Sequence, residues 1–142
     1  LRMNSFLNKW LDYLDGQGTA ESLTSPAAGP VANVNDMPTG LPLIGGSAIE
    51  DQTLTVDTSG ITDADGPGAF SLQWLRDGVA ISGAGGNSYT LGDADVGRLI
   101  TVRVDYLDAQ GMSETLTSAA VGPVANVNDA PTGLPVISGT LL

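Results

Sequence analysis

Carboxylate and amide side chains gather in four short clusters along this chain, and their oxygens are the groups that could do chemistry. Ca²⁺ takes about six to eight oxygen ligands, which loops rich in Asp, Asn and Glu can supply. The clusters therefore predict calcium binding. They are Glu50-Asp51, Asp63-Ala64-Asp65-Gly66, Asp93-Ala94-Asp95, and a junction that occurs twice, as Asn33-Val34-Asn35-Asp36 and as Asn126-Val127-Asn128-Asp129.

The loop at Asp63 has the clearest ligand spacing. In Asp-X-Asp both carboxylates can turn onto one ion, and the Gly66 that follows relaxes the backbone. The loop does not begin an EF-hand, because Pro67 and Trp74 stand where two further ligands belong. A plain solvated turn remains an open interpretation of this loop.

The other clusters also have simpler interpretations. Asp95 could cap backbone amides in a turn or pair with Arg98. Each junction could be a linker in which Pro sets the chain direction and the Asn side chains cap turns. Glu50-Asp51 could be a solvated strand start. Because the junction is repeated almost unchanged, it argues against all of these simpler interpretations being true at once.

Composition narrows the function classes. The net charge is −11 with five basic residues, which disfavours binding to nucleic acids and to membrane surfaces and favours cations as partners. The chain contains neither histidine nor cysteine, so zinc, copper and disulfides are disfavoured while oxygen-ligand cations remain possible. No apolar run approaches the roughly 20 residues of a membrane span.

Enzymes and carbohydrate-binding modules are weaker alternatives. A glycosidase needs two carboxylates held across a cleft, and without His or Cys no nucleophile and base pair can be assembled, so we expect no enzymatic activity. A carbohydrate-binding module needs exposed aromatic platforms, whereas aromatic residues make up 5% of the chain. A passive spacer that binds no metal is the more serious alternative.

An internal repeat sets the domain organisation. Residues 13–46 match residues 106–139 at 25 of 34 positions, at a constant offset of 93 residues. This period fits one sandwich domain of about 100 residues and is too long for a helical solenoid. We expect residues 13–36 to be the closing strands of one repeat, residues 37–129 a complete repeat, and residues 130–142 the first strand of a following repeat.

Hydropathy patterning predicts half-buried strands in the complete repeat. Apolar and polar residues alternate over residues 53–57, 70–74 and 100–105. Asp77-Gly78 predicts a tight hairpin into a strand over 79–82. A turn over 108–111 precedes a last strand near 114–121. With 19 glycines and 8 prolines, this indicates an all-β sandwich of about seven strands, with Trp74 at the centre of its core.

Residues 1–12 depart from the repeat. The strand alternation is lost there, and the match to the second copy begins at Asp12. The large apolar residues fall at helical spacing and could form an amphipathic partner-binding helix, although we favour a boundary or truncation. They are Met3, Phe6, Leu7, Trp10, Leu11 and Leu14.

These motifs resemble a known family. Asn128-Asp129-Ala130-Pro131, Glu50-Asp51-Gln52-Thr53-Leu54, Gln73-Trp74-Leu75-Arg76-Asp77-Gly78 and the segment from Tyr89 to Gly97 look like the cadherin-like and immunoglobulin-like tandem repeats of large secreted RTX-type bacterial adhesins. The resemblance covers residues 13–142. It implies an extracellular or cell-surface β-sandwich, immunoglobulin- or cadherin-like, that spaces or presents an adhesive tip in cell adhesion or biofilm formation.

The resemblance also implies how the acidic residues divide between two calcium sites. Glu50, Asp93 and Asp95 would face the junction formed by Asn126, Asn128 and Asp129. Asp63 and Asp65 would face the earlier junction, formed by Asn33, Asn35 and Asp36. Each site has only part of its ligands in this chain, so we expect a dissociation constant at or beyond the weak end for extracellular modules, roughly 10⁻⁴ to 10⁻³ M. Neighbouring repeats are the implied partners, and other domains would hold any cell-surface or matrix ligand.

Overall fold

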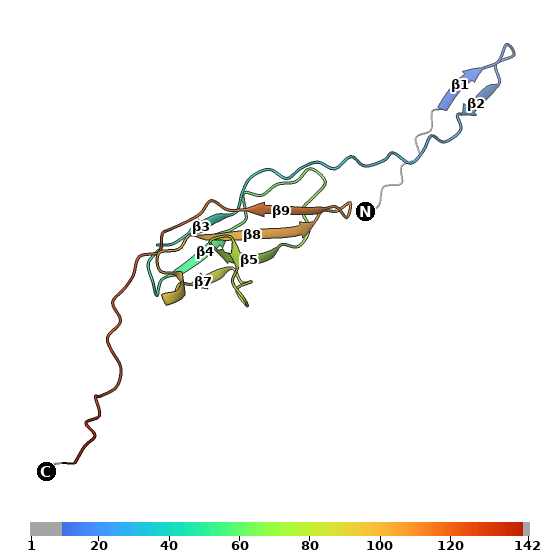
Figure 1. Cartoon of the computed structure of the whole chain (residues 1–142). Coiled ribbons are helices and arrows are strands. Elements are labelled where there is room, and N and C mark those ends of the chain that lie inside the picture. Colours follow the sequence, from blue (N-terminus) through green and yellow to red (C-terminus); the bar gives the residue numbers. More distant parts are fainter. Residues whose placement is uncertain (1–9, 141–142) are drawn as a thin grey trace. The chain divides into compact units, whose positions relative to one another are not determined.

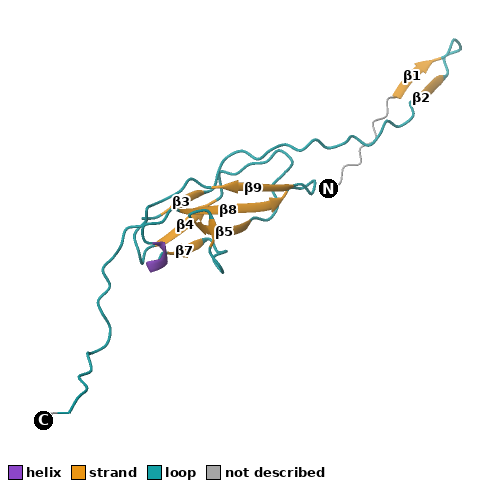
Figure 2. Cartoon of the chain, viewed as in Figure 1, coloured by secondary structure: helices purple, strands orange, loops and turns teal. Residues whose placement is uncertain are grey.

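The fold is all-β and divides into two compact units. The computed structural model describes residues 10–140. The chain separates between Asn35 and Asp36 into a short N-terminal unit and a larger C-terminal unit. Figures 1 and 2 display the strands of each unit, and no α-helix occurs within residues 10–140. The all-β prediction is confirmed at this level.

Two antiparallel sheets build the larger unit. One has the order β3-β4-β7, and the other has the order β6-β5-β8-β9. The bounds are β3 Leu43–Gly45, β4 Thr53–Asp57, β5 Ser71–Arg76, β6 Val79–Ala80, β7 Ser88–Thr90, β8 Ile100–Leu107 and β9 Ser113–Thr117, with a short 3₁₀ helix, η1, at Asp93–Asp95.

The two sheets share one core. Leu54 of β4 and Trp74 of β5 are both fully buried, in a cluster that also contains Ile100 and Val102 of β8. The predicted alternation is confirmed on β8, where every second residue from Ile100 to Tyr106 is buried. Because apolar side chains from both sheets meet in this cluster, the larger unit is layered as a β-sandwich would be.

Trp74 lies at the centre of that core, as predicted. Its indole Nε1 donates a hydrogen bond to the Gly86 carbonyl at 2.9 Å, so the one polar atom of the side chain has a partner. The ring stacks on Tyr89 with centroids 5.8 Å apart. A second buried cluster contains Ile61, Val104 and Tyr106.

The hairpin between β5 and β6 confirms the predicted turn. Arg76 pairs with Val79, and the two residues between them have positive φ, 46° at Asp77 and 81° at Gly78. These are the angles that a two-residue hairpin of the type I′ class requires. The predicted strand over 79–82 is too long, however: β6 ends at Ala80, because the Trp74 N–H bonds the Ala84 carbonyl at 2.9 Å instead of the Ile81 carbonyl that would continue the ladder.

The smaller unit contains one hairpin, of β1 (Trp10–Leu14) and β2 (Ala20–Thr24). Asp15 closes its turn: Oδ1 accepts the N–H groups of Gln17 and Thr19 at 2.8 and 2.9 Å. The strand includes Trp10, Leu11 and Leu14, so the helical spacing noted in the sequence does not produce a helix there. Met3, Phe6 and Leu7 lie outside the described residues.

Residues 131–140 form no strand. The apolar side chains there are almost fully exposed, at 91% for Leu134, 90% for Val136 and 98% for Ile137. In the preceding repeat the matching strand β3 pairs with β4, and no described residue pairs with 136–138 in this way. The assignment of residues 130–142 to a following repeat therefore stays a prediction.

Truncating the central tryptophan should destabilise the larger unit strongly. We expect Trp74→Ala to lower the free energy of unfolding by about 3–5 kcal/mol, because it leaves a large cavity and removes a buried hydrogen bond. Val79→Ala is the matched control, since Val79 is 70% exposed and its truncation should change stability by less than about 0.5 kcal/mol. Urea unfolding followed by circular dichroism measures both, and similar losses in the two variants would contradict the assigned core.

Candidate metal site at one end of the sandwich

The segment that follows β9 runs back along the sandwich. Backbone bridges pair Val121 with Ile100 in the antiparallel sense and Val124 with Val96 in the parallel sense. The opposite side of the segment pairs with residues 48–50. The Glu50 N–H donates to the Ala125 carbonyl at 2.9 Å, and the Ala125 N–H donates to the Ala48 carbonyl at 2.9 Å. The exit segment is therefore held on both sides.

Gly122 permits the exit segment to lie close to residues 97–100. Its φ is +121°, and a Cβ built there would lie 2.6 Å from the Arg98 carbonyl oxygen. A side chain would force the exit segment away from residues 97–100. The glycine therefore contributes directly to where residues 124–129 leave the sandwich.

Three of the predicted ligands come together at this end. Carboxylate oxygens of Glu50, Asp93 and Asp129 all lie within 4.8 Å of one another. Glu50 comes from the segment before β4, Asp93 from η1 and Asp129 from the exit segment, so chain positions up to 79 residues apart (129 − 50) converge. Glu50 is 2% exposed, while Asp93 and Asp129 are exposed.

Glu50 also holds the exit segment by its side chain. Its Oε2 accepts the Val127 N–H at 2.9 Å. That hydrogen bond lowers the pKa of the Glu50 carboxyl, but burial and the neighbouring charges of Asp93 and Asp129 outweigh it, and the pKa is raised above its ordinary value. The three carboxylates thus repel one another at neutral pH, and a divalent cation between them would remove that repulsion.

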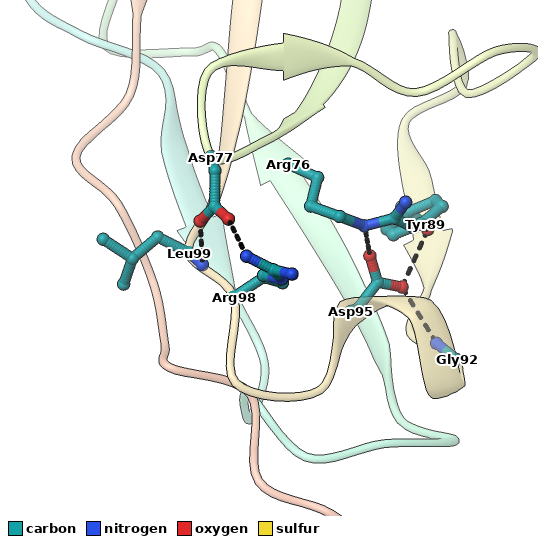
Figure 3. A network of polar contacts seen from close by, with 7 residues as sticks. All are labelled: Arg76, Asp77, Tyr89, Gly92, Asp95, Arg98 and Leu99. Atoms are coloured by element: carbon teal, nitrogen blue, oxygen red, sulfur yellow. Dashed lines mark hydrogen bonds and ion pairs between the residues drawn. The ribbon is translucent and has the colours of Figure 1, made fainter.

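Asp93 owes its position to Asp95. Asp95 is 1% exposed, and both of its oxygens accept hydrogen bonds from within the sandwich (Figure 3): Oδ1 from Arg76 Nε at 2.7 Å, and Oδ2 from the Tyr89 hydroxyl at 2.8 Å and the Gly92 N–H at 2.9 Å. These contacts fix η1, which leaves the side chain of Asp93 at the surface.

Asp95 therefore differs from the ligand role expected for it. The expectation grouped Asp93 and Asp95 at one ion, whereas the group of converging carboxylates contains only Asp93 of the two. The alternative ion pair of the Asp95 carboxylate with the Arg98 side chain also does not form: Arg98 Nη1 donates to Asp77 Oδ2 at 3.1 Å (Figure 3). The simpler interpretation, in which Asp95 caps backbone amides, matches its bond from Gly92.

The carboxylates of Asp63 and Asp65 accept hydrogen bonds from donors of the protein and do not converge on a shared ion site. Asp63 Oδ1 accepts the Asp65 N–H at 2.9 Å, and Oδ2 accepts the Tyr106 hydroxyl at 2.6 Å. Asp65 Oδ2 accepts the Asp36 N–H at 2.8 Å. Among residues 10–140 these two carboxylates belong to no group of three close enough to share an ion.

The junction asparagines are exposed. Asn126 and Asn128 flank Val127 on the exit segment, next to the Glu50 group. Asn33 and Asn35 are likewise exposed but belong to the smaller unit. Asp36 begins the larger unit, and its backbone N–H donates a hydrogen bond to the Asp65 carboxylate.

Sequence reasoning overlooked Asp108, which it assigned only to a turn. Asp108 is 5% exposed. Its Oδ1 accepts the N–H groups of Gln110 and Met112 at 2.8 Å each, and its Oδ2 is buried without a hydrogen-bond partner. The repeat carried a signal, because Asp15 occupies the same place in the β1–β2 turn.

Asp108 belongs to an acidic neighbourhood around Tyr106. Burial raises the pKa of the Tyr106 hydroxyl, and so do its hydrogen bond to Asp63 and the charges of Glu114 and Asp108. Tyr106 therefore remains a neutral hydrogen-bond donor at physiological pH.

Searches against known protein families, curated proteins and solved structures found no match. Within the described part of the chain, no helix is long and apolar enough to cross a membrane.

Asp95 should make stability depend on pH. Burial by itself would raise the pKa of Asp95, but hydrogen bonds from Arg76, Gly92 and Tyr89 and the charge of Arg76 lower it overall. An acid with a lowered pKa in the folded state stabilises the fold above its unfolded pKa, and this stabilisation is lost as pH falls through the folded pKa. We expect Asp95→Asn to cost on the order of 3 kcal/mol at pH 7 and progressively less below about pH 4.

Asp77→Asn is the control for that series. The Asp77–Arg98 pair is exposed and should contribute about 0–1 kcal/mol, and Asn-Gly retains the preferred turn sequence. Urea unfolding between pH 2.5 and 7 measures both variants. A loss for Asp95→Asn that does not change with pH would show that its charge is not what stabilises η1.

Proposed function

We propose that this chain is a structural repeat module of a large extracellular bacterial adhesin or surface protein, in which Ca²⁺ stiffens the junction between repeats. The observation that carries the proposal is the convergence of Glu50, Asp93 and Asp129 at the end of the sandwich where the chain leaves it. Oxygen ligands of this kind are those that Ca²⁺ prefers, and the place where the chain passes from one repeat to the next is where a spacer would need rigidity.

The strand order supports an immunoglobulin- or cadherin-like sandwich. In the larger unit the first, second and fifth strands share one sheet, and the third, fourth, sixth and seventh share the other. Immunoglobulin-type sandwiches divide their strands in this way, apart from the fourth strand, which changes sheet between variants. The buried Trp74 on the third strand also fits that type.

The geometry suggests how the ion would act mechanically. Beyond Ala125, the hydrogen bond from the Val127 N–H to Glu50 is the one backbone or side-chain hydrogen bond that holds the exit segment to the sandwich within residues 10–140. An ion bound by Asp129 of the exit segment together with Glu50 and Asp93 of the sandwich would add a second, stronger attachment. Three carboxylates supply fewer than the six to eight oxygens that Ca²⁺ takes, so the exposed asparagines Asn126 and Asn128, backbone carbonyls, water or a following repeat would complete the shell.

Charge supports the same proposal. A net charge of −11 destabilises a compact array through self-repulsion. Calcium binding would neutralise carboxylates where they are closest together. The extracellular location follows from the family resemblance and from the millimolar affinity range of such modules, which suits calcium concentrations outside cells.

A metal-independent spacer is the second candidate. Asp63, Asp65 and Asp95 favour it, because their carboxylates accept hydrogen bonds from the protein itself. In that case the acidic loops serve as turn closures and keep the chain soluble, and only the Glu50 group would need another explanation.

Thermal unfolding in chelator and in increasing Ca²⁺, with Mg²⁺ as the comparison ion, separates the two candidates. For a dissociation constant of about 1 mM, 10 mM Ca²⁺ should stabilise the native state by about 1.4 kcal/mol, a shift of several degrees in Tm. We expect Glu50→Gln to abolish this shift. Burial and the charges of Asp93 and Asp129 raise the pKa of Glu50. In chelator the same substitution should therefore relieve charge repulsion, although it weakens the hydrogen bond from the Val127 N–H.

Asp51→Asn is the matched control, since Asp51 is the adjacent carboxylate and is exposed. Its φ of 65° is one that Asn tolerates. Asp51→Asn should keep the full calcium response. An identical response in Glu50→Gln and in the unsubstituted chain would rule out the Glu50 group as the site, and no response in any of the three would favour the metal-independent spacer.

A further inference from the structure

The short segment from Leu91 to Arg98 holds together the parts of the chain that carry the three converging carboxylates. On the N-terminal side of η1, the Leu91 N–H donates to the Gln52 carbonyl at 2.9 Å, and the Leu91 carbonyl accepts the Asp51 N–H at 3.1 Å. Leu91 is itself buried in the core. The chain immediately after Glu50 is therefore attached to the chain immediately before η1.

The exit segment is attached on the other side of η1. The Gly97 N–H donates to the Val124 carbonyl at 2.9 Å, and the Val124 N–H donates to the Arg98 carbonyl at 3.0 Å. The helix η1 therefore lies between the attachment of the Glu50 segment and the attachment of the exit segment. Its placement sets the distance from the Asp93 carboxylate to the other two carboxylates of the site.

The Asp95 carboxylate fixes η1 to both sheets of the sandwich. One oxygen accepts the Nε–H of Arg76, which lies on β5 of the four-stranded sheet, and the other accepts the hydroxyl of Tyr89, which lies on β7 of the three-stranded sheet (Figure 3). Arg76 Nη2 also donates to the Tyr89 hydroxyl at 3.4 Å, so the three side chains form one network. Because Asp95 is almost completely buried, these hydrogen bonds are stronger than they would be in water.

Tyr89 connects this network to the core. Its aromatic ring stacks on Trp74 with centroids 5.8 Å apart, and its hydroxyl donates to Asp95 at 2.8 Å. Asp93 and Asp95 belong to the same turn of 3₁₀ helix. The core therefore places the Tyr89 hydroxyl, the hydroxyl helps to place Asp95, and Asp95 places the helix that carries Asp93.

We propose that Tyr89, Arg76 and Asp95 are positioning residues of the cation site. They act through Asp93, because they hold its carboxylate near the other two, and they thereby determine how tightly the ion binds. Groups that orient metal ligands commonly change metal affinity by about 10- to 100-fold when they are substituted. This inference rests on the calcium function proposed above and goes beyond it, because it assigns part of the affinity to side chains inside the sandwich.

Substitutions that leave the net charge unchanged test the proposal, because weaker binding in them cannot be attributed to a lost charge. Tyr89→Phe removes one hydroxyl. Tyr106→Phe is its matched control, because the Tyr106 hydroxyl donates to Asp63 at 2.6 Å in the other buried cluster. Arg76→Lys keeps the charge but loses the planar fork of donors. Arg98→Lys is its matched control, because the ion pair of Arg98 is exposed.

The measurement is a Ca²⁺ titration of the whole chain followed by the NMR shift of the Val127 amide. This amide donates to Glu50, so its shift reports on this site. We expect Tyr89→Phe and Arg76→Lys each to raise the dissociation constant about fivefold, since each weakens one hydrogen-bonded link between η1 and the sheets. Both controls should keep the dissociation constant of the unsubstituted chain.

Urea unfolding in chelator measures the stability of each variant separately, and the two pairs are independent, so either pair decides if a variant of the other does not fold. A Tyr89→Phe chain that loses stability in chelator but keeps the dissociation constant would overturn the inference alone, because the network would then only stabilise the fold. Equally weakened binding in Tyr106→Phe would also overturn it. Absence of a Ca²⁺-dependent shift at Val127 in the unsubstituted chain would overturn the calcium function itself, and the inference with it.

Discussion

The return of the exit segment along the sandwich is the constraint on which the rest of the structure depends. Residues 121–125 pair with residues 96–100 on one side and with residues 48–50 on the other. This pairing buries Val124, at 3% exposure, in the same cluster as Trp74. It also aligns Glu50 with Val127 and so determines where Asp129 can lie. One backbone arrangement therefore closes the core and assembles the carboxylate group.

Six of the predicted ligand carboxylates in the larger unit fall into two physical classes. Those of Asp63, Asp65 and Asp95 accept hydrogen bonds from donors of the protein, which stabilises loops without any ion. Those of Glu50, Asp93 and Asp129 lie close to one another, and burial together with these neighbouring charges raises the pKa of Glu50. Spacing along the chain does not distinguish the classes, because Asp93 and Asp95 are two residues apart and belong to different ones.

The β1–β2 and β8–β9 hairpins separate local from nonlocal determinants of the fold. An Asp in the turn and alternating residues on both arms suffice to form the same register twice. Burial of the hairpin needs Ile61, Phe70 and Leu72, which come from 30 or more residues earlier in the chain. The contrast is physical: hydrogen bonds of a short turn form between neighbours, whereas an apolar face is buried only when a distant strand covers it.

The sequence by itself determined the alternating strands over residues 53–57, 70–74 and 100–105, the two-residue turn at Asp77-Gly78, the burial of Trp74 and the internal repeat, because each of these follows from local alternation, backbone preference or identity of residues. It also named Glu50, Asp93 and Asp129 among the candidate ligands. Only the tertiary structure decided that these three converge while Asp95 binds Arg76 and Tyr89, and that β6 ends at Ala80. The reason is that partner choice for a carboxylate depends on which donors the packed sheets bring within about 3 Å, and a linear sequence does not contain that distance.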